Sequence, residues 1–203
     1  MSDRREVILE AALRVIARSG ADAATHRAVA AEAGVALAST TYHFESKSAL
    51  VQEALQLVIE RSTAAVERHS AAPGPDDAEQ LVDRLVQLVA ALSSDRRAPL
   101  AAQYELILEA GRRPHLQPLA ERWNEAYLAG LEALVQRAGL ARPALAAEAI
   151  SNLIEGALLN QLALPREGFA EGPLREMLEA VVGGLERSLL RAGTSRRRQR
   201  RLL

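Results

Sequence analysis

The run LASTTYH (37–43) gathers small, hydroxyl-bearing and aromatic side chains where a free-standing surface helix would carry charges. Hydroxyl and imidazole groups can hydrogen-bond the base edges or the phosphates of nucleic acid, and Leu and Ala can contact the methyl group of thymine. This chemistry suits a surface that lies in the major groove of DNA. The candidate DNA-reading residues are Leu37, Ala38, Ser39, Thr41, Tyr42 and His43.

Two flanking residues could hold DNA phosphates without reading the base sequence. Thr25 is placed to cap the start of a helix, whose free N–H groups attract anions. Lys47 falls in the first turn of the next long helix, where its ammonium group could meet a second phosphate. Two of the candidate readers keep other interpretations: Tyr42 could be a phosphate contact or a half-buried core residue, and His43 could be a cap or a phosphate donor.

The spacing of apolar residues predicts the helices that would position these groups. Positions 3–19 carry apolar residues on one helical face. Two short helices are predicted over 25–33 and 36–44, joined by a tight connection at Gly34. A tight, glycine-containing connection sets two short helices at a steep angle, which is the arrangement of a helix-turn-helix.

The rest of the chain also has a helical pattern. Apolar residues make up 49% of the chain and aromatic residues only 3%, and the abundance of Ala and Leu favours helices over strands. We therefore expect an all-α fold of about nine helices. After residue 44, the predicted helices span about 46–68, 78–93, 98–110, 115–138, 143–164 and 174–191.

Three short motifs stand in the N-terminal part of the chain: T-x-R-x-V-A at 25–30, A-G-V at 33–35 and Y-H-F-x-S-K at 42–47. With these motifs, residues 3–50 resemble the DNA-binding domain of the TetR family of transcriptional repressors. The resemblance implies three N-terminal helices on DNA, with His26 and Arg27 among the contacts. It also implies a helical ligand-binding domain and dimerisation through the last two helices. Thr40 departs from the family pattern, because it stands at an inward position that is usually apolar.

The charge distribution supports a division of the chain into three parts. The net charge is −1, but residues 1–50 are neutral, residues 51–190 are acidic, and six arginines follow residue 190. An acidic body would repel a polyanion, so we expect the DNA contacts in the N-terminal part. The expected parts are a DNA-binding domain over 1–48 with its motif at about 26–45, an effector-binding and dimerisation domain over 49–191, and a basic, disordered tail over 192–203.

Several functional classes find no support in the sequence. The N-terminus lacks the apolar run of a signal peptide, and no apolar stretch reaches the ~18 residues of a membrane span, so we expect a cytoplasmic protein without membrane contact. Cysteine is absent and the 4 histidines lack the spacing of a metal site, so neither a metal nor a cofactor is expected. No nucleophile–base pair, paired carboxylates or phosphate loop indicates an enzyme.

The predicted C-terminal domain carries candidates for a ligand pocket and for a dimer interface. Ordinary core filling is an equally good interpretation of Trp123 and Tyr127. Gly156 and Gly184 each cost a helix about 1 kcal/mol relative to Ala, and close helix–helix approach would explain them. The pocket candidates are Gln103, Tyr104, Trp123, Tyr127, Asn152 and Glu155; the interface candidates are Leu153, Gly156, Ala157, Asn160, Leu164, Met177, Val181, Gly184, Leu185 and Ser188.

These observations together predict a homodimeric, sequence-specific repressor that binds double-stranded DNA at a palindromic operator. An unidentified small-molecule effector is expected to relieve that binding. Two alternatives remain open: a helical adaptor that uses the same N-terminal surface, and a DNA-binding regulator without a small-molecule ligand.

Overall fold

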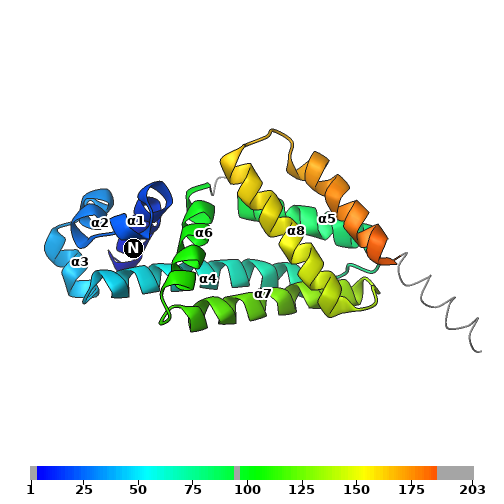
Figure 1. The fold of residues 1–203 in the computed structure, drawn as a ribbon, viewed down its shortest axis with the longest axis horizontal. Helices are drawn as coiled ribbons and strands as arrows, with labels where there is room; N and C mark the ends of the chain where they lie inside the picture. The colour runs from blue at the N-terminus through cyan, green and yellow to red at the C-terminus, as the bar shows by residue number, and fades with distance from the viewer. Residues whose placement is uncertain (1–3, 94–96, 187–203) are drawn as a thin grey trace, which may run out of the picture. The chain divides into compact units, whose positions relative to one another are not determined.

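The structure, a computed structural model, describes residues 4–93 and 97–186, and in these ranges it contains helices and connecting turns but no strand (Figure 1). The expected all-α fold of about nine helices is confirmed for this part of the chain. The α-helices are α1 (Arg4–Ser19), α2 (His26–Ala33), α3 (Leu37–His43), α4 (Lys47–Ala71), α5 (Ala78–Ser93), α6 (Arg97–Arg112), α7 (Gln117–Arg137), α8 (Pro143–Ala163) and a further helix over 175–186, with short helical turns η1 (Ala21–Ala23) and η2 (Ala170–Leu174).

Local signals begin and end the N-terminal helices. The Thr25 hydroxyl precedes α2 and accepts a hydrogen bond from the N–H of Ala28 at 3.2 Å. Gly34 ends α2 with a φ of 66°, a left-handed conformation that glycine adopts without strain. The Ser46 hydroxyl accepts a hydrogen bond from the N–H of Ala49 at 3.1 Å at the start of α4. These caps fix a short helix, a tight turn and a second short helix, as the sequence predicts.

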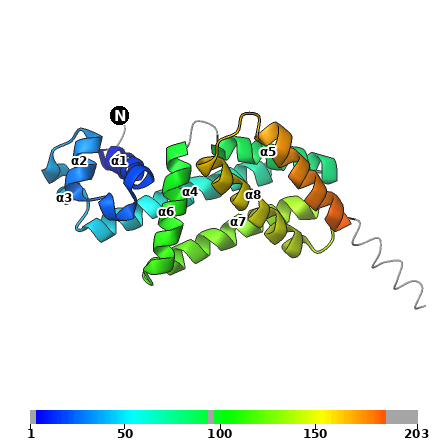
Figure 2. The same ribbon diagram turned by 45° about the horizontal axis from the view of Figure 1, so that its top comes forward.

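An apolar core holds α1, α2 and α3 together, and Figure 2 shows these three N-terminal helices lying close to one another. Ile8 and Ile16 of α1 are fully buried, as is Val29 of α2. Phe44, directly after α3, belongs to the same core. Leu106 of α6 completes it from a distant part of the sequence. The helix α3 is therefore supported by a packed apolar core.

The described chain divides into two compact units that do not follow the order of the sequence. The first contains residues up to 64 together with 92–125, and the second contains 65–91 together with the described residues from 126 onward. The helices α4 and α7 each begin in the first unit and end in the second. Within the first unit, α6 packs against α1. The N-terminal domain that we expected over 1–48 is thus in contact with a later helix.

Within the second unit, α4 and α7 approach each other closely at Gly130. The Gly130 carbonyl accepts a hydrogen bond from the Ser70 hydroxyl at 3.0 Å. A Cβ added to Gly130 would overlap with the Cγ1 atom of Val66, which is itself buried. Glycine at this position therefore permits the two helices to lie side by side.

The ends of several elements differ from the sequence predictions by a few residues. The helix α4 continues to Ala71 instead of ending at about residue 68, and α7 begins at Gln117 instead of residue 115. The turn η1 occupies a segment that carried no helix prediction. Ser188 and the arginine-rich tail over 192–203 lie outside the described residues. None of the described helices is long and apolar enough to span a membrane.

Candidate nucleic-acid interface

The side chains of α3 divide sharply into an inner and an outer set. Thr40 is completely buried, and Phe44 behind the helix is nearly so. Tyr42 has an exposed fraction of 85%, and Leu37 is 45% exposed. A side chain as exposed as Tyr42 contributes little to the core, so the interpretation of Tyr42 as a half-buried core residue does not fit. The outer set is free to contact a partner.

The two threonines of α3 satisfy their hydroxyl groups in different ways. The buried Thr40 hydroxyl donates to the carbonyl of Leu37 at 2.8 Å, which explains how a polar residue fills an inward position that is usually apolar. The Thr41 hydroxyl is exposed and lies 3.2 Å from the carbonyl of Ala38, to which it donates. Its oxygen can still accept a hydrogen bond from a base or from water.

The remaining candidate DNA-reading residues of α3 lie on or beside its outer face. Ala38 is exposed, whereas Ser39 and His43 are half-buried. The His43 ring meets the Tyr42 ring edge-on, with their centroids 5.2 Å apart. The helix N-cap, Ala36, offers no side-chain hydrogen bond.

At the start of α2, the three predicted contacts have different environments. Thr25 and Arg27 are exposed, so both can reach a ligand from solvent. His26 is half-buried, and its Nδ1 atom is buried without a hydrogen-bond partner among the described residues. The buried Nδ1 atom of His26 is therefore not accessible to a ligand from solvent.

Lys47 has partners that the sequence did not indicate. Its ammonium group donates to the carboxylate of Asp22 at 2.9 Å and to the Asp22 carbonyl at 2.7 Å. Arg113 reaches the same carboxylate at 3.2 Å. The hydrogen bond from Lys47, together with the positive charges of Lys47 and Arg113, holds the pKa of Asp22 below its ordinary value. Lys47 is thus engaged within the protein rather than held open for a phosphate.

Ion pairs also neutralise most of the arginines of α1. Arg14 and Arg18 both pair with Glu32, at 2.7 Å and 3.1 Å. Their hydrogen bonds lower the pKa of the Glu32 carboxyl. Arg5 pairs with Glu53 and lies over the ring of Phe44. Three of the four arginines of α1 are therefore paired with carboxylates of the protein.

The ligand-pocket candidates are distributed over both compact units. Gln103, Tyr104 and Trp123 belong to the first unit, whereas Tyr127, Asn152 and Glu155 belong to the second. Trp123 and Tyr127 are buried, Asn152 is exposed, and the other three are half-buried.

Two of these candidates have a defined polar environment. The indole N–H of Trp123 donates to the Ser62 hydroxyl at 2.7 Å, and both residues are buried. Burial raises the pKa of the Glu155 carboxyl, although a hydrogen bond from Ser151 opposes the shift.

Most interface candidates are accessible on the isolated chain. On α8, Gly156, Asn160 and Leu164 are exposed and Leu153 is half-buried, but Ala157 is buried. The sequence reasoning missed the exposed leucines Leu145 and Leu159. Leu145, Asn152 and Leu159 follow one another at intervals of seven residues, which places them on one face of α8. This helical periodicity could have predicted the two leucines as interface candidates. Met177, Val181, Gly184 and Leu185 of the helix over 175–186 are half-buried.

Two family models match this chain, one in its N-terminal part and one in the rest of the chain. The model described as "Bacterial regulatory proteins, tetR family" matches residues 8–54, which include α2 and α3. The model described as "Tetracyclin repressor-like, C-terminal domain" matches residues 76–188, more than half of the chain.

Individual relatives agree with these matches. The HTH-type nicotine-responsive transcriptional repressor HdnoR of Paenarthrobacter nicotinovorans is 31% identical over 113 residues, which are 56% of this chain and 57% of that protein, less than two thirds of its length. A solved TetR-family structure from Streptomyces coelicolor A3 is 33% identical, covers 88% of this chain and 98% of its own, and has a TM-score of 0.70. The multidrug binding protein EbrR, solved with ethidium, is also 33% identical with the same coverage and a TM-score of 0.64.

Proposed function

The chain belongs to the TetR family of bacterial regulatory proteins and is a DNA-binding transcriptional repressor, and from that premise we propose that it acts as a homodimer at a palindromic operator and is released by a small molecule. The observation that carries the proposal is the outer face of α3. Its Tyr42 is 85% exposed, while Thr40 and Phe44 anchor the helix from behind. An exposed row of hydroxyl, aromatic and small apolar groups on an anchored short helix fits the major groove.

The proposed DNA-binding domain spans residues 1–48, and α3 enters the major groove. Leu37, Ala38 and Thr41 face the base edges, and Tyr42 stands at the rim of the same surface. Thr25, His26 and Arg27 at the start of α2 meet the phosphate backbone, as does Lys47 when it leaves Asp22. Such backbone contacts set the register of the protein on DNA, and the base contacts set its sequence preference.

The proposed dimer forms through α8 and the helix over 175–186, within an effector-binding and dimerisation domain over 49–191. The exposed residues Leu145, Gly156 and Leu159 form a stripe on α8 that supports this choice. The two leucines are large apolar groups on the surface, and such groups favour association. A two-fold dimer would place its two α3 helices in successive major grooves, about 34–36 Å apart or a multiple of that spacing. A palindromic operator follows from this symmetry.

The proposed effector is a small aromatic molecule. Aromatic organic cations are the first compounds to test for binding. Two relatives support this class: HdnoR is described as nicotine-responsive, and EbrR has been solved with ethidium, proflavin and malachite green. A ligand that favours a DNA-incompetent arrangement must weaken DNA binding, and DNA must weaken ligand binding by the same factor. Trp123 is the only tryptophan of the chain, so its fluorescence can report binding directly.

A selection of bound sequences from a random duplex pool tests the proposal most directly. We expect the full chain to enrich a palindrome, and ethidium or proflavin to reduce binding to it. If no palindrome is enriched, the operator-binding dimer is wrong, and a helical adaptor becomes the better interpretation. If a palindrome is enriched but organic cations neither bind nor release it, a DNA-binding regulator outside this ligand class remains.

A further inference from the structure

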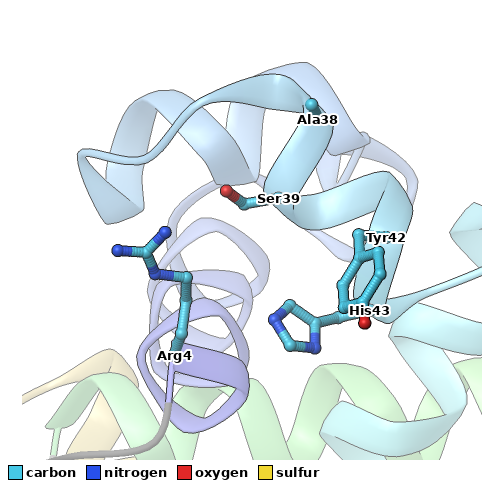
Figure 3. A pocket seen from close by; sticks show the side chains of 5 residues that line it. All are labelled: Arg4, Ala38, Ser39, Tyr42 and His43. Atoms are coloured by element: carbon cyan, nitrogen blue, oxygen red, sulfur yellow. The ribbon is translucent and has the colours of Figure 1, made fainter.

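A shallow pocket of about 440 Å³ lies between the first turn of α1 and the outer face of α3. Figure 3 shows the Arg4 side chain reaching from α1 toward α3, with the side chains of Ser39 and His43 pointing toward it. Ala38 and Tyr42 complete the lining. The pocket thus joins part of the predicted DNA-reading surface to a cation from a separate helix.

Arg4 differs from the other arginines of α1 in its pairing. Within residues 4–93 and 97–186, Arg4 forms no ion pair, whereas Arg5 pairs with Glu53 and both Arg14 and Arg18 pair with Glu32. Arg4 is also exposed. Among the described residues, the charge of Arg4 is therefore not balanced by a carboxylate, whereas the charge of its neighbour Arg5 is balanced by Glu53.

The lining groups suit an oxyanion. A guanidinium group donates several hydrogen bonds in a planar fork that matches a phosphate, and serine hydroxyl and imidazole N–H groups can add further donors. Among the residues that the structure describes, no carboxylate lines the pocket. A site that combines a fixed positive charge with neighbouring donors favours a phosphate over a neutral base edge.

The position of the pocket indicates which phosphate it would meet. A helix with its side chains nearly fills a major groove about 12 Å wide, so groups at its flank face the phosphates along the groove edge. Arg4 stands at the flank of α3, across the pocket from Ser39 and His43. We infer that this pocket holds a backbone phosphate of bound DNA, with Arg4 as its principal cation.

This inference rests on the proposed function, and it changes the roles of two residues. Ser39 and His43 become phosphate contacts; the sequence placed both among the candidate base readers and left a phosphate role open for His43. The reading of bases is then left to Leu37, Ala38 and Thr41, with Tyr42 at the rim. Phosphate contacts weaken binding uniformly across sequences when they are removed, and that behaviour separates the two roles.

The test compares Arg4→Ala with Arg5→Ala in the full chain, using fluorescence anisotropy with labelled random-sequence duplex between about 50 and 200 mM salt. Each phosphate contact contributes about 0.9 to the slope of log affinity against log salt. We expect Arg4→Ala to reduce that slope by about 0.9 per bound chain, Arg4→Lys to retain it, and Arg5→Ala to leave it unchanged. Equal slopes for Arg4→Ala and wild type overturn the inference, as do equal losses for Arg4→Ala and Arg5→Ala.

A second arm repeats the titrations with poly(dA–dT) and poly(dG–dC) duplexes. A phosphate contact predicts the same fold-loss for Arg4→Ala on both. A larger loss on the A·T duplex would place Arg4 in a narrow minor groove instead and would overturn the assignment. Wild-type protein that binds none of the duplexes with steep salt dependence would overturn the proposed function itself, whereas salt-dependent binding that is insensitive to Arg4 overturns only this inference.

Discussion

Lys47 is bound to Asp22 at two points, through a 2.9 Å contact to the carboxylate and a 2.7 Å contact to the backbone carbonyl. Asp22 lies in η1, and Lys47 opens α4, so the pair ties two elements of the N-terminal region together. Arg113, at the end of α6, reaches the same carboxylate and also pairs with Glu109. A DNA phosphate that binds Lys47 must therefore compete with an internal carboxylate.

Replacing Asp22 with Asn should strengthen binding to random duplex. The substitution removes the carboxylate charge that holds Lys47, so the Lys47 ammonium becomes available to phosphates, whereas Arg113 keeps its ion pair with Glu109. We expect the salt slope to steepen by about 0.9 for each new phosphate contact. Anisotropy titrations check this, with Glu125→Gln as a control that removes an exposed carboxylate of the same unit. Weaker binding of Asp22→Asn would mean that Asp22 orients Lys47 for DNA instead of withholding it.

Tyr42→Ala and Lys47→Ala should each weaken DNA binding. Tyr42 is 85% exposed, so its removal should leave the helical content and the oligomeric state unchanged. Electrophoretic mobility shifts with a selected operator, together with circular dichroism, check both points. Tyr42→Phe separates the hydroxyl from the ring. Unchanged affinity in both alanine variants would show that this surface does not contact DNA.

Leu159→Glu should convert the proposed dimer to monomer. Leu159 is 53% exposed on the isolated chain, so a charge there is tolerated by the fold but not by an apolar interface. Leu108→Glu is the matched control, because Leu108 of α6 is 57% exposed and lies outside the proposed interface. Sedimentation analysis at micromolar concentration should find the control dimeric. A wild-type monomer, or a dimeric Leu159→Glu, would exclude this interface.

Gly130→Ala should lower the free energy of unfolding. The new methyl group would overlap with Val66, and overpacking of this kind costs about 1–3 kcal/mol. The better helix propensity of Ala, about 1 kcal/mol, offsets only part of that cost. Gly111→Ala is the control, because its Cβ would meet nothing within 4 Å. Urea denaturation should show a lower free energy of unfolding for Gly130→Ala than for wild type. The double variant Gly130→Ala/Val66→Ala should show a smaller loss than the sum of the losses of its two single variants. Equal stability of Gly130→Ala and Gly111→Ala would contradict the close packing.

Glu155→Gln should change how stability depends on pH. Burial raises the pKa of Glu155, so the folded state holds the proton more tightly than the unfolded chain. Stability is therefore greatest below the ordinary pKa of a glutamate and falls as pH rises through the folded value. The Gln variant should lack this decline. Denaturation between about pH 4 and pH 8 checks it, with exposed Glu148→Gln on the same helix as control; a Gln variant less stable than wild type at the upper pH would disprove it.

Local signals were enough to predict the helix-turn-helix. Thr25, Gly34 and Ser46 act within three or four residues of their position in the chain, so their effects can be inferred without a fold. The inward position of Thr40 could be predicted from the resemblance, but its hydrogen bond to the Leu37 carbonyl could not. That contact depends on the rotamer that the surrounding core imposes.

Contacts between distant segments could not be predicted. Lys47 looked like a free phosphate contact because Asp22 is 25 residues away, across a turn with no predicted structure. The pocket of Arg4 needs the start of α1 to lie beside α3, and periodicity does not supply that distance. The overlap that makes Gly130 necessary likewise depends on the packing of α7 on α4.

The division of α3 into buried and exposed sides separates two kinds of evolutionary constraint. Thr40 and Phe44 hold the helix in place, so changes there put folding at risk. Leu37, Ala38 and Tyr42 contribute little to the core, so they can mutate at almost no cost in stability. A descendant of this protein could therefore acquire a new target sequence by a few substitutions on one helical face while every supporting contact stays intact.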